Sequence, residues 1–244
     1  MDIPKSTLRK ALRSMMASLY DAFFPQYSHV PYERSADEAV KALSGLTGNE
    51  TAESFRERIP LLAELLSQDV EAIKGNDPAA SDIQEVVYCY PAVTAMVHYR
   101  VAHELDNLGV KIIPRILTEY AHSETGIDIH PEARIGHHFA IDHGTGVVIG
   151  QTAVIGNHVT LYQGVTLGAK NFKYDESGRP RNIPRHPIIG DNVTVYSNAS
   201  LLGRITVGEG SVIGGNVWLT HSVPPCSRIL QGRTQEEFLD GAGI

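Results

Sequence analysis

Aliphatic residues recur at every sixth position from Ile129 onward, and no other feature of the chain limits its fold as strongly. The residue four places further on is small or branched, as Ala153 and Val159 are. This pattern predicts a parallel β-helix, in which each hexad supplies one short strand and a turn and the aliphatic side chains stack inward. The strands of a β-sandwich would vary in spacing. Three registers carry the repeat: Ile129, Ile135, Ile141 and Val147; Ile149, Ile155, Leu161 and Leu167; and Ile189, Val195, Leu201, Val207, Ile213 and Leu219.

The repeat is interrupted at two places. Between Val147 and Ile149 the register slips by two residues, next to Asp142 and His143. The 22 positions from Leu167 to Ile189 are not a multiple of six, which predicts a loop that leaves the coil over about residues 169–187. Because functional residues concentrate where a regular scaffold becomes irregular, we expect the site at these interruptions.

The first half of the chain has the spacing of helices instead. Its apolar residues follow a helical period, "SADE" at 35–38 has the form of a capping box, and Asp77 before Pro78 has the form of an N-cap. We therefore predict an α+β chain: an all-α region over 1–124, a β-helix over 125–226 and a C-terminal tail over 227–244. The helices can cover one open end of the β-helix, as a solenoid requires.

Charge and cysteine content narrow the classes of function. The net charge is −7 and no polybasic run is present, which argues against a nucleic-acid or anionic-membrane binder. Two cysteines in dissimilar contexts, Cys89 and Cys226, do not form a disulfide framework, and Cys89 is expected in the core. The N-terminus has no continuous apolar segment of a signal peptide and no apolar run could span a membrane, so a cytoplasmic location is expected.

Four segments resemble serine O-acetyltransferase, a family of hexapeptide-repeat acyltransferases. They are "NDPA" at 76–79, "DIHPEARIG" at 128–136, "IDHGTGVVIGQTAVIGNHVTLYQGVTLGA" at 141–169 and "RHPIIGDNV" at 185–193. The resemblance implies a left-handed parallel β-helix, assembled as a homotrimer, or as two trimers joined through their helical halves. It also implies active sites between neighbouring subunits and a catalytic role for the β-helix, with the helical region contributing to the serine site.

By resemblance, His143 is the general base and Asp128 the carboxylate that orients it. A serine hydroxyl hardly ionises at pH 7, and a neutral imidazole can take its proton as the hydroxyl attacks the thioester of acetyl-CoA. Acetyl-CoA is then a co-substrate, and no bound cofactor, metal or acyl-enzyme nucleophile is needed.

The family also suggests positions for both substrates. L-serine carries an ammonium and a carboxylate, so its site should offer both charges. Backbone contacts to coenzyme A are implied at small residues, and its phosphates could meet loop cations on grounds of charge alone. The implied serine-binding residues are Asp77, Asp142, Arg185 and His186, the coenzyme A positions are Ala169, Ser197 and Gly215, and the loop cations are Lys170, Lys173, Arg179 or Arg181.

The terminal segment "DGAGI" gives a partner hypothesis. Members of the family commonly end in an isoleucine that enters the active site of O-acetylserine sulfhydrylase. Ile244, with Gly241 and Gly243 before it, fits that pattern because glycines extend the reach of the terminal carboxylate.

Other interpretations remain open from sequence alone. A related acetyltransferase could act on a sugar or on a modified serine, and a noncatalytic β-helix could serve as a scaffold. A β-helical carbonic anhydrase would place zinc on three histidines, for which His138 and His143 have a suitable spacing. Taken singly, Asp77, Asp128, His143 and Arg185 could be ordinary cap, turn or loop residues, and inhibition by cysteine rests only on its likeness to serine.

Overall fold

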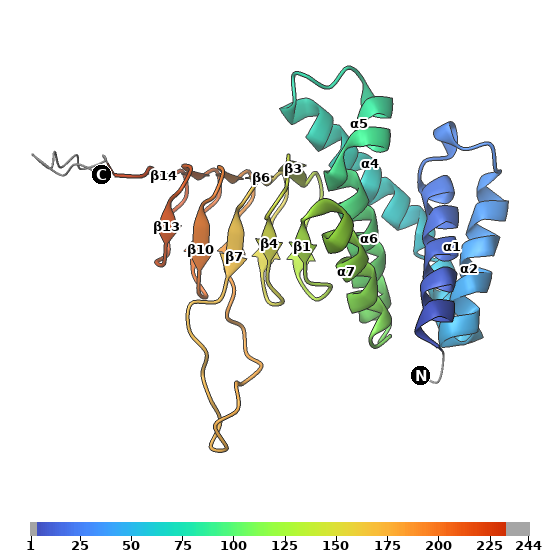
Figure 1. Ribbon diagram of the computed structural model, residues 1–244. Coiled ribbons are helices and arrows are strands. Elements are labelled where there is room, and N and C mark those ends of the chain that lie inside the picture. The colour runs from blue at the N-terminus through green and yellow to red at the C-terminus, as the bar shows by residue number, and fades with distance from the viewer. Residues whose placement is uncertain (1–3, 233–244) are drawn as a thin grey trace, which may run out of the picture.

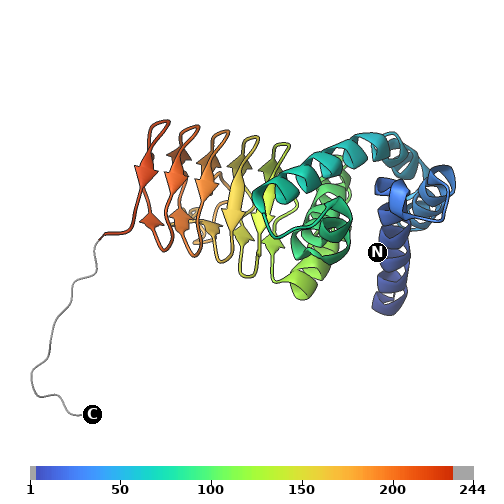
Figure 2. The same ribbon diagram turned by 90° about the horizontal axis from the view of Figure 1, so that it is seen from above.

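The computed structural model describes residues 4–232, and it consists of a helical region followed by a β-helix (Figure 1). Seen from above in Figure 2, the coils of the β-helix follow one another in a row that ends against the helices. No helix among the described residues is long and apolar enough to cross a membrane. The helices are α1 Lys5–Phe23, the 3-10 helix η1 Pro25–Tyr27, α2 Tyr32–Thr47, α3 Asn49–Arg56, α4 Ile59–Asn76, α5 Ile83–Cys89, α6 Pro91–Asn107 and α7 Ile113–Thr125.

Amphipathic spacing explains how the helical region packs. In α1, Leu8, Leu12, Met15 and Leu19 recur at helical spacing and are buried, so one face of this helix contacts α2 and α4. Helices α4, α6 and α7 contact the first coil of the β-helix, α7 on β1 and α4 and α6 on β3. The helical region therefore covers the N-terminal end of the β-helix, as expected.

Three details of the helical region differ from the sequence-based expectation. Helix α4 continues through Asn76, so Asp77 follows a helix instead of capping one, and Asp82 caps α5 by accepting the N–H of Glu85 at 2.8 Å. Ser35 lies buried inside α2, which begins at Tyr32, so no capping box forms there. Cys89 is exposed, because it falls on the outer side of the short helix α5.

The β-helix has three parallel sheets, which we name A, B and C in the order in which each coil passes through them. Sheet A contains β1 Asp128–Ile129, β4 Val148–Ile149, β7 Thr166–Gly168, β10 Ser200–Leu202 and β13 Trp218–Leu219. Sheet B contains β2 Arg134–Ile135, β5 Val154–Ile155, β8 Ile188–Ile189 and β11 Thr206–Val207. Sheet C contains β3 Ala140–Asp142, β6 Thr160–Tyr162, β9 Thr194–Val195, β12 Val212–Ile213 and β14 Arg228–Ile229. The residues of the six-residue repeat point inward and are buried, so the predicted fold class is confirmed.

Strand register confirms both interruptions of the repeat. Asp128 pairs with Val148, and Val148 pairs with Thr166, so the first coil is longer than the second. The two extra residues of the first coil lie between β3 and β4, beside His143. Val154 pairs with Ile188 across the loop between β7 and β8, which makes that coil almost twice as long as its neighbours. Figure 1 shows this loop hanging below the β-helix.

A buried ion pair joins the helices to the open end of the β-helix. The guanidinium of Arg100 on α6 bonds both carboxylate oxygens of Asp69 on α4, and their side chains are 5% and 2% exposed. Arg100 also donates to the carbonyl oxygens of Ile135 and Gly136, and Asp69 accepts the N–H of Phe139 at 2.9 Å. These carbonyl and N–H groups belong to the first coil, which has no preceding coil to pair with, so the ion pair satisfies an edge that would otherwise be buried without partners.

Replacing Arg100 by Met should lower the free energy of unfolding by about 3–5 kcal/mol, because Asp69 would remain buried without a counter-charge. Urea unfolding followed by circular dichroism measures this loss. The control is Arg34→Met, which breaks the exposed pair with Glu38 and should cost under about 1 kcal/mol. Equal losses in the two variants would contradict this account of the junction.

Candidate active site

The slip in the repeat forms a turn that presents His143 to solvent. Five residues, 143–147, connect β3 to β4, whereas three residues, 163–165, connect β6 to β7 in the next coil. His143 and Gly144 both adopt left-handed backbone conformations, with φ of 56° and 87°. A Cβ on Gly144 would lie 2.5 Å from Cδ1 of Ile127, so only glycine fits there. The result is an imidazole on a fixed turn, with its side chain 73% exposed.

Two carboxylates lie close to this imidazole. Asp142 Oδ1 is 3.8 Å from Nε2 of His143. Asp77, which follows α4, is near enough for the charge of His143 to help lower its pKa. The structure therefore brings three of the predicted residues together, from two elements far apart in sequence. We call Asp77, Asp142 and His143 the acidic half-site.

Tyr90, which sequence reasoning missed, fixes Asp77 in the acidic half-site. Its hydroxyl donates to Oδ2 of Asp77, and the N–H of Ala79 donates to Oδ1 at 2.8 Å. These two hydrogen bonds are the main cause of the lowered pKa of Asp77, and in return the carboxylate raises the pKa of Tyr90 to about 12. Asp77 is thus held as a carboxylate that can meet a cation.

Asp128 lies beside the turn of His143, although its carboxylate faces a different partner. Its backbone N–H donates to the carbonyl of Val147 at 2.9 Å, which places the first residue of β1 next to the end of the turn. Its Oδ1 is 3.7 Å from NH1 of Arg115 on α7. Among the described residues, no hydrogen bond joins Asp128 to His143.

Arg185 and His186 stand together where the long loop rejoins the coil. Thr152 Oγ1 accepts the backbone N–H groups of both residues, at 2.9 Å and 3.1 Å. The guanidinium of Arg185 donates to Oε1 of Gln151 at 2.8 Å, and Arg204 bonds the carbonyl of His186 at 3.0 Å. We call Arg185 and His186 the basic half-site. Sequence reasoning missed Thr152 and Gln151, which hold it in place.

The imidazole of His186 is kept neutral in one tautomer. Its Nδ1 accepts the backbone N–H of Thr152 at 3.1 Å, which leaves the proton on Nε2. Burial, with the nearby charges of Arg185, His130 and Arg204, lowers its pKa to about 4. A Cβ on Gly150 would collide with the ring of His186, so the absence of a side chain at 150 makes room for it. His186 can therefore donate a hydrogen bond from Nε2 at neutral pH.

The two half-sites lie at opposite edges of sheet A. His143 follows β3 of sheet C and precedes β4 of sheet A, whereas Arg185 follows the loop that leaves β7 of sheet A and precedes β8 of sheet B. One chain therefore contains both the acidic and the basic half-site, but the two do not meet within that chain.

The predicted coenzyme A positions are divided in the same way. Ser197 and Gly215 stack in successive turns between sheets C and A, where the N–H of Asn216 donates to the carbonyl of Ser197 at 2.9 Å. A Cβ on Gly215 would approach that carbonyl to 3.2 Å. Ala169 follows β7 at the opposite edge of sheet A, at the start of the long loop. The structure thus brings Ser197 and Gly215 together and leaves Ala169 apart from them.

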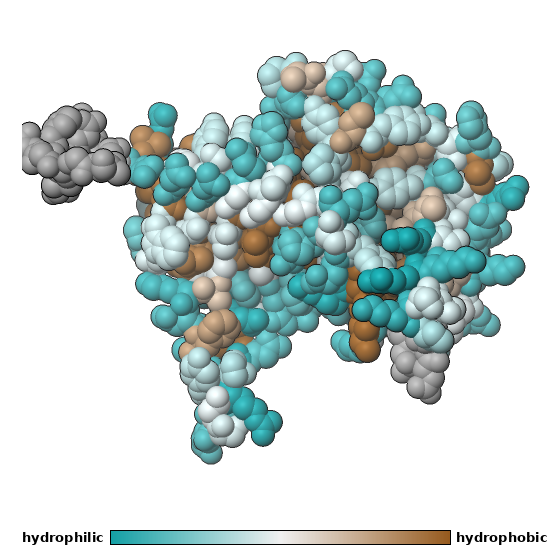
Figure 3. Space-filling model, viewed as in Figure 1, coloured by the Kyte–Doolittle hydropathy of each residue, from teal (hydrophilic) through white to brown (hydrophobic). Residues whose placement is uncertain are grey.

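A basic cavity lies beside Ala169, between the long loop and the coil. Its volume is about 320 Å³, and its cations come from both walls. Figure 3 shows that the lower part of the loop is mostly hydrophilic. The cationic residues that line the cavity are Lys170, Lys173, Arg181, Arg185 and Arg204. Of the four predicted loop cations, Arg179 is absent from this lining.

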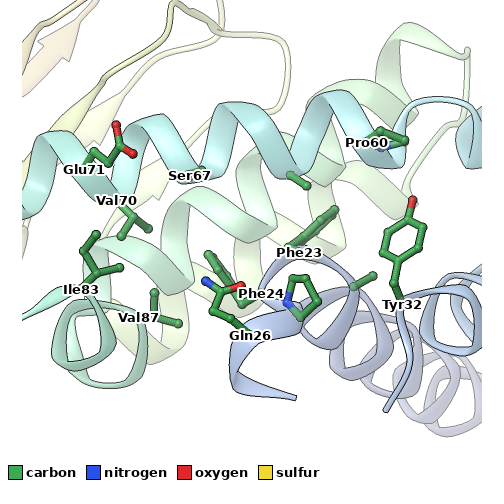
Figure 4. Close-up of a pocket in the computed structure, with 13 residues that line it drawn as sticks. Phe23, Phe24, Gln26, Tyr32, Pro60, Ser67, Val70, Glu71, Ile83 and Val87 are labelled. Atoms are coloured by element: carbon green, nitrogen blue, oxygen red, sulfur yellow. The ribbon is translucent and has the colours of Figure 1, made fainter. Parts of the chain in front are cut away.

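A second cavity, of about 420 Å³, lies within the helical region and holds none of the predicted site residues. Phe23, Phe24, Tyr32, Pro60 and Val87 are among the side chains around it (Figure 4). Glu71 is the one charged side chain among the residues that line it, and no cation stands beside it, so we do not place the chemistry there.

Two of the predicted residues stand outside these groups. Ile244 lies outside the described residues. His138 is in a turn between sheets B and C, and His143 is in a turn between sheets C and A, so the zinc pair considered for a carbonic anhydrase does not form within the chain.

Known proteins resemble this chain in sequence and in structure. The family described as bacterial transferase hexapeptide (six repeats) matches residues 186–221. A protein of Synechococcus elongatus named "Serine acetyltransferase, plasmid" is 52% identical over 209 residues, which make up 85% of this chain and 66% of that protein. The chain thus spans just under two thirds of the length of this relative.

Two solved structures extend the comparison. Serine acetyltransferase isoform 3 of Entamoeba histolytica, in complex with cysteine, matches with a TM-score of 0.81 and 34% identity over 93% of this chain and 83% of that one. Serine acetyltransferase of Brucella abortus, in complex with coenzyme A, matches with a TM-score of 0.69 and 27% identity over 91% of this chain and 79% of that one.

The parallel β-helix, the two half-sites and these matches define the class: the chain is a hexapeptide-repeat acyltransferase. Within that class it belongs to the serine acetyltransferase family. The resemblance seen in the sequence is confirmed.

The neutral state of His186 can be tested by titration. In histidine NMR spectra, the resonance that disappears in His186→Asn should not titrate between pH 5 and pH 8, because burial lowers the pKa of His186 to about 4. A titration midpoint of about 6.5, the usual value for histidine, would contradict this. Since the folded pKa is depressed, His186 stabilises the fold fully above the unfolded value, and this contribution is lost as the pH falls from about 6.5 toward about 4.

Proposed function

We propose that the protein transfers the acetyl group of acetyl-CoA to the hydroxyl of L-serine, forming O-acetylserine for cysteine synthesis. The main support is the charge of the two half-sites: carboxylates of Asp77 and Asp142 on one, the guanidinium of Arg185 on the other. An α-amino acid carries the two complementary charges, whereas a sugar hydroxyl carries neither. A site made of both halves fits an amino acid best.

His143 acts as the general base. Its exposed imidazole stands on a fixed turn, where a serine hydroxyl can reach it. As His143 takes the proton, the hydroxyl oxygen attacks the thioester carbon, and the thiolate of coenzyme A then leaves with the proton from the imidazole. Serine and acetyl-CoA react directly, so no acyl-enzyme forms.

Carboxylates stabilise the imidazolium during this step. Asp142 is already beside the ring, and Asp128 borders the same turn. Catalytic hydrogen bonds often tighten only when substrate is bound, and a rotation of the Asp128 side chain away from Arg115 would direct it toward the ring. Asp128 remains our proposed partner of His143.

The serine molecule is held at both of its charged ends. Asp77, kept ionised by Tyr90 and Ala79, receives the ammonium together with Asp142. Arg185 receives the carboxylate, and the Nε2–H of neutral His186 donates to the carboxylate or the hydroxyl. Cysteine has the same charged ends, so we propose that it competes for this site, and the Entamoeba structure with cysteine supports this.

Coenzyme A lies along the edges of sheet A. Ser197 and Gly215 offer a surface with little side-chain bulk, and the basic cavity beside Ala169 offers cations for the phosphates. The matching Brucella structure with coenzyme A supports such a site. Acetyl-CoA is the only cofactor-like molecule that this reaction uses.

The active site is completed between subunits of a homotrimer. Because the half-sites lie at opposite edges of sheet A, the acidic half-site of one copy can meet the basic half-site of the next. Around a three-fold axis this contact repeats and closes. Trp218 on sheet A is 71% exposed, and Tyr196, in the turn that leads to β10 of the same sheet, is 43% exposed, as expected of residues that another subunit covers. We further propose that two such trimers join through their helical regions. Ile244 then binds in the active site of O-acetylserine sulfhydrylase, and both proteins act in the cytoplasm.

Removing the base should abolish most of the activity. His143→Asn retains a residue that tolerates the left-handed conformation, and it should lower kcat by roughly 10²–10⁴-fold because the proton has no acceptor. The assay follows thiol release from acetyl-CoA with serine, homoserine, phosphoserine and a galactoside in parallel.

His221→Asn, at an exposed position after β13, is the matched control and should keep full activity. An undiminished rate in His143→Asn would overturn the mechanism, and a preference for the galactoside would overturn the substrate.

Co-expressing two inactive variants tests the shared site. His143→Asn and Arg185→Ala should each be inactive alone, yet mixed trimers should regain about a third of the wild-type activity, because one site of each mixed trimer combines the intact half of both variants. Activity of purified mixed trimers, separated by two affinity tags, measures this. No recovery in mixed trimers would show that each chain builds its own site.

A further inference from the structure

Three histidines that take no part in the proposed reaction converge on one side of the β-helix. His137 and His138 lie in the turn between β2 and β3, and His158 lies in the equivalent turn of the next coil. One ring nitrogen from each lies within 4.8 Å of the others, and the Nδ1 atoms of His137 and His138 are 2.7 Å apart. The rings of His138 and His158 stack at 4.5 Å. Among the described residues, this is the one group of three or more metal-ligating side chains placed so closely.

The coil geometry holds this cluster in place. His138 and His158 occupy equivalent positions in successive turns between sheets B and C, with φ of 52° and 55°. The column of equivalent positions continues through Asn192, Gly210 and Cys226, which are also left-handed. Asparagine and glycine adopt this conformation more readily than histidine does. The N–H of His158 donates to the carbonyl of His137 at 3.0 Å, and the side chain of Asn157 accepts the N–H of His137 at 3.1 Å. Two adjacent coils therefore present their imidazoles at a fixed separation.

One side of the histidine cluster faces solvent. Glu71 on α4 is the carboxylate near His138. His158 is exposed, which leaves the cluster open to solvent on one side.

The chemistry of the donors indicates which ions would bind. Neutral imidazoles suit zinc, copper and nickel, whereas magnesium and calcium prefer oxygen ligands. Zinc bonds to histidine at about 2.0–2.1 Å, and three such bonds need nitrogen atoms roughly 3.3 Å apart. The Nδ1 atoms of His137 and His138 are 2.7 Å apart and all three ligand nitrogens lie within 4.8 Å of one another, so small side-chain rotations suffice.

We propose that His137, His138 and His158 form a binding site for one divalent transition-metal ion, with zinc as the ion that fits best and a coordination position left for water. The ion would join the first coil to the second at the edge between sheets B and C, away from His143 and from both half-sites. It would therefore stabilise the fold without taking part in acetyl transfer.

Zinc titration of the untagged, chelator-treated protein tests the proposal. Isothermal calorimetry should give one zinc ion per chain. His158→Asn and His138→Asn should each weaken binding by about 100-fold or more, since loss of an outer-shell partner alone weakens metal sites 10–100-fold. Asparagine suits these left-handed positions, as Asn192 shows in the same column, so both variants should fold. His221→Asn is the matched control and should bind like the wild type.

A second readout identifies the donors directly. The copper-loaded protein should show an electron paramagnetic resonance pattern from three nitrogen ligands, reduced to two in His158→Asn. Zinc should raise the Tm of the wild type and leave the Tm of His158→Asn unchanged. Absence of zinc binding to the wild type, or equal binding by His158→Asn and the wild type, would overturn the site. None of these measurements depends on serine acetylation.

Discussion

The bidentate pair between Asp69 and Arg100 is the contact on which the rest of this structure depends. A parallel β-helix satisfies its backbone by stacking coil on coil, so its first coil must find partners elsewhere. Here one guanidinium supplies donors to the carbonyls of Ile135 and Gly136, while the carboxylate receives the N–H of Phe139. Because both charges are buried, removal of either side chain would leave the other charge buried without a partner. The pair therefore fixes α4 and α6 on the first coil, and α4 in turn leads directly to Asp77 at the site.

We propose that the placement of the half-sites makes activity a property of the homotrimer. The turns between sheets C and A carry Asp142 and His143, and the turns between sheets A and B carry Arg185 and His186. The width of sheet A separates them, and the rigid coil cannot fold one edge onto the other. Under the proposed function, a second copy of the chain is therefore needed to bring the proposed base next to the proposed carboxylate-binding groups. The long loop adds cations at this edge of sheet A and rejoins the coil directly at Arg185.

The sequence predicts those parts of the structure whose interactions repeat periodically along the chain. Stacking in a β-helix is periodic, so the six-residue pattern predicted the coils, and the slip marked the turn of His143. Side-chain contacts between distant segments leave no such pattern. Tyr90 meets Asp77 only because α5 and α6 return toward the end of α4, and Thr152 holds Arg185 and His186 from a different coil. The prediction that Asp77 caps the start of a helix was wrong, because α4 continues to Asn76 and Asp77 follows its end.

The cluster of His137, His138 and His158 lies between these two cases. The coil repeat brings these histidines together, but only when the two extra residues of the first coil are counted. The register that pairs Arg134 with Val154 and Ile135 with Ile155 also places His158 directly above His138. A search for histidines separated by one regular coil misses this pair, because the slip beside His143 lies between them in sequence and lengthens the coil. Once the slip is included, the two positions coincide in the column of left-handed turns. The two-residue slip beside His143 therefore helps to identify the proposed base in the sequence, but it makes the proposed metal site harder to find there. The two sites lie on separate sides of the β-helix.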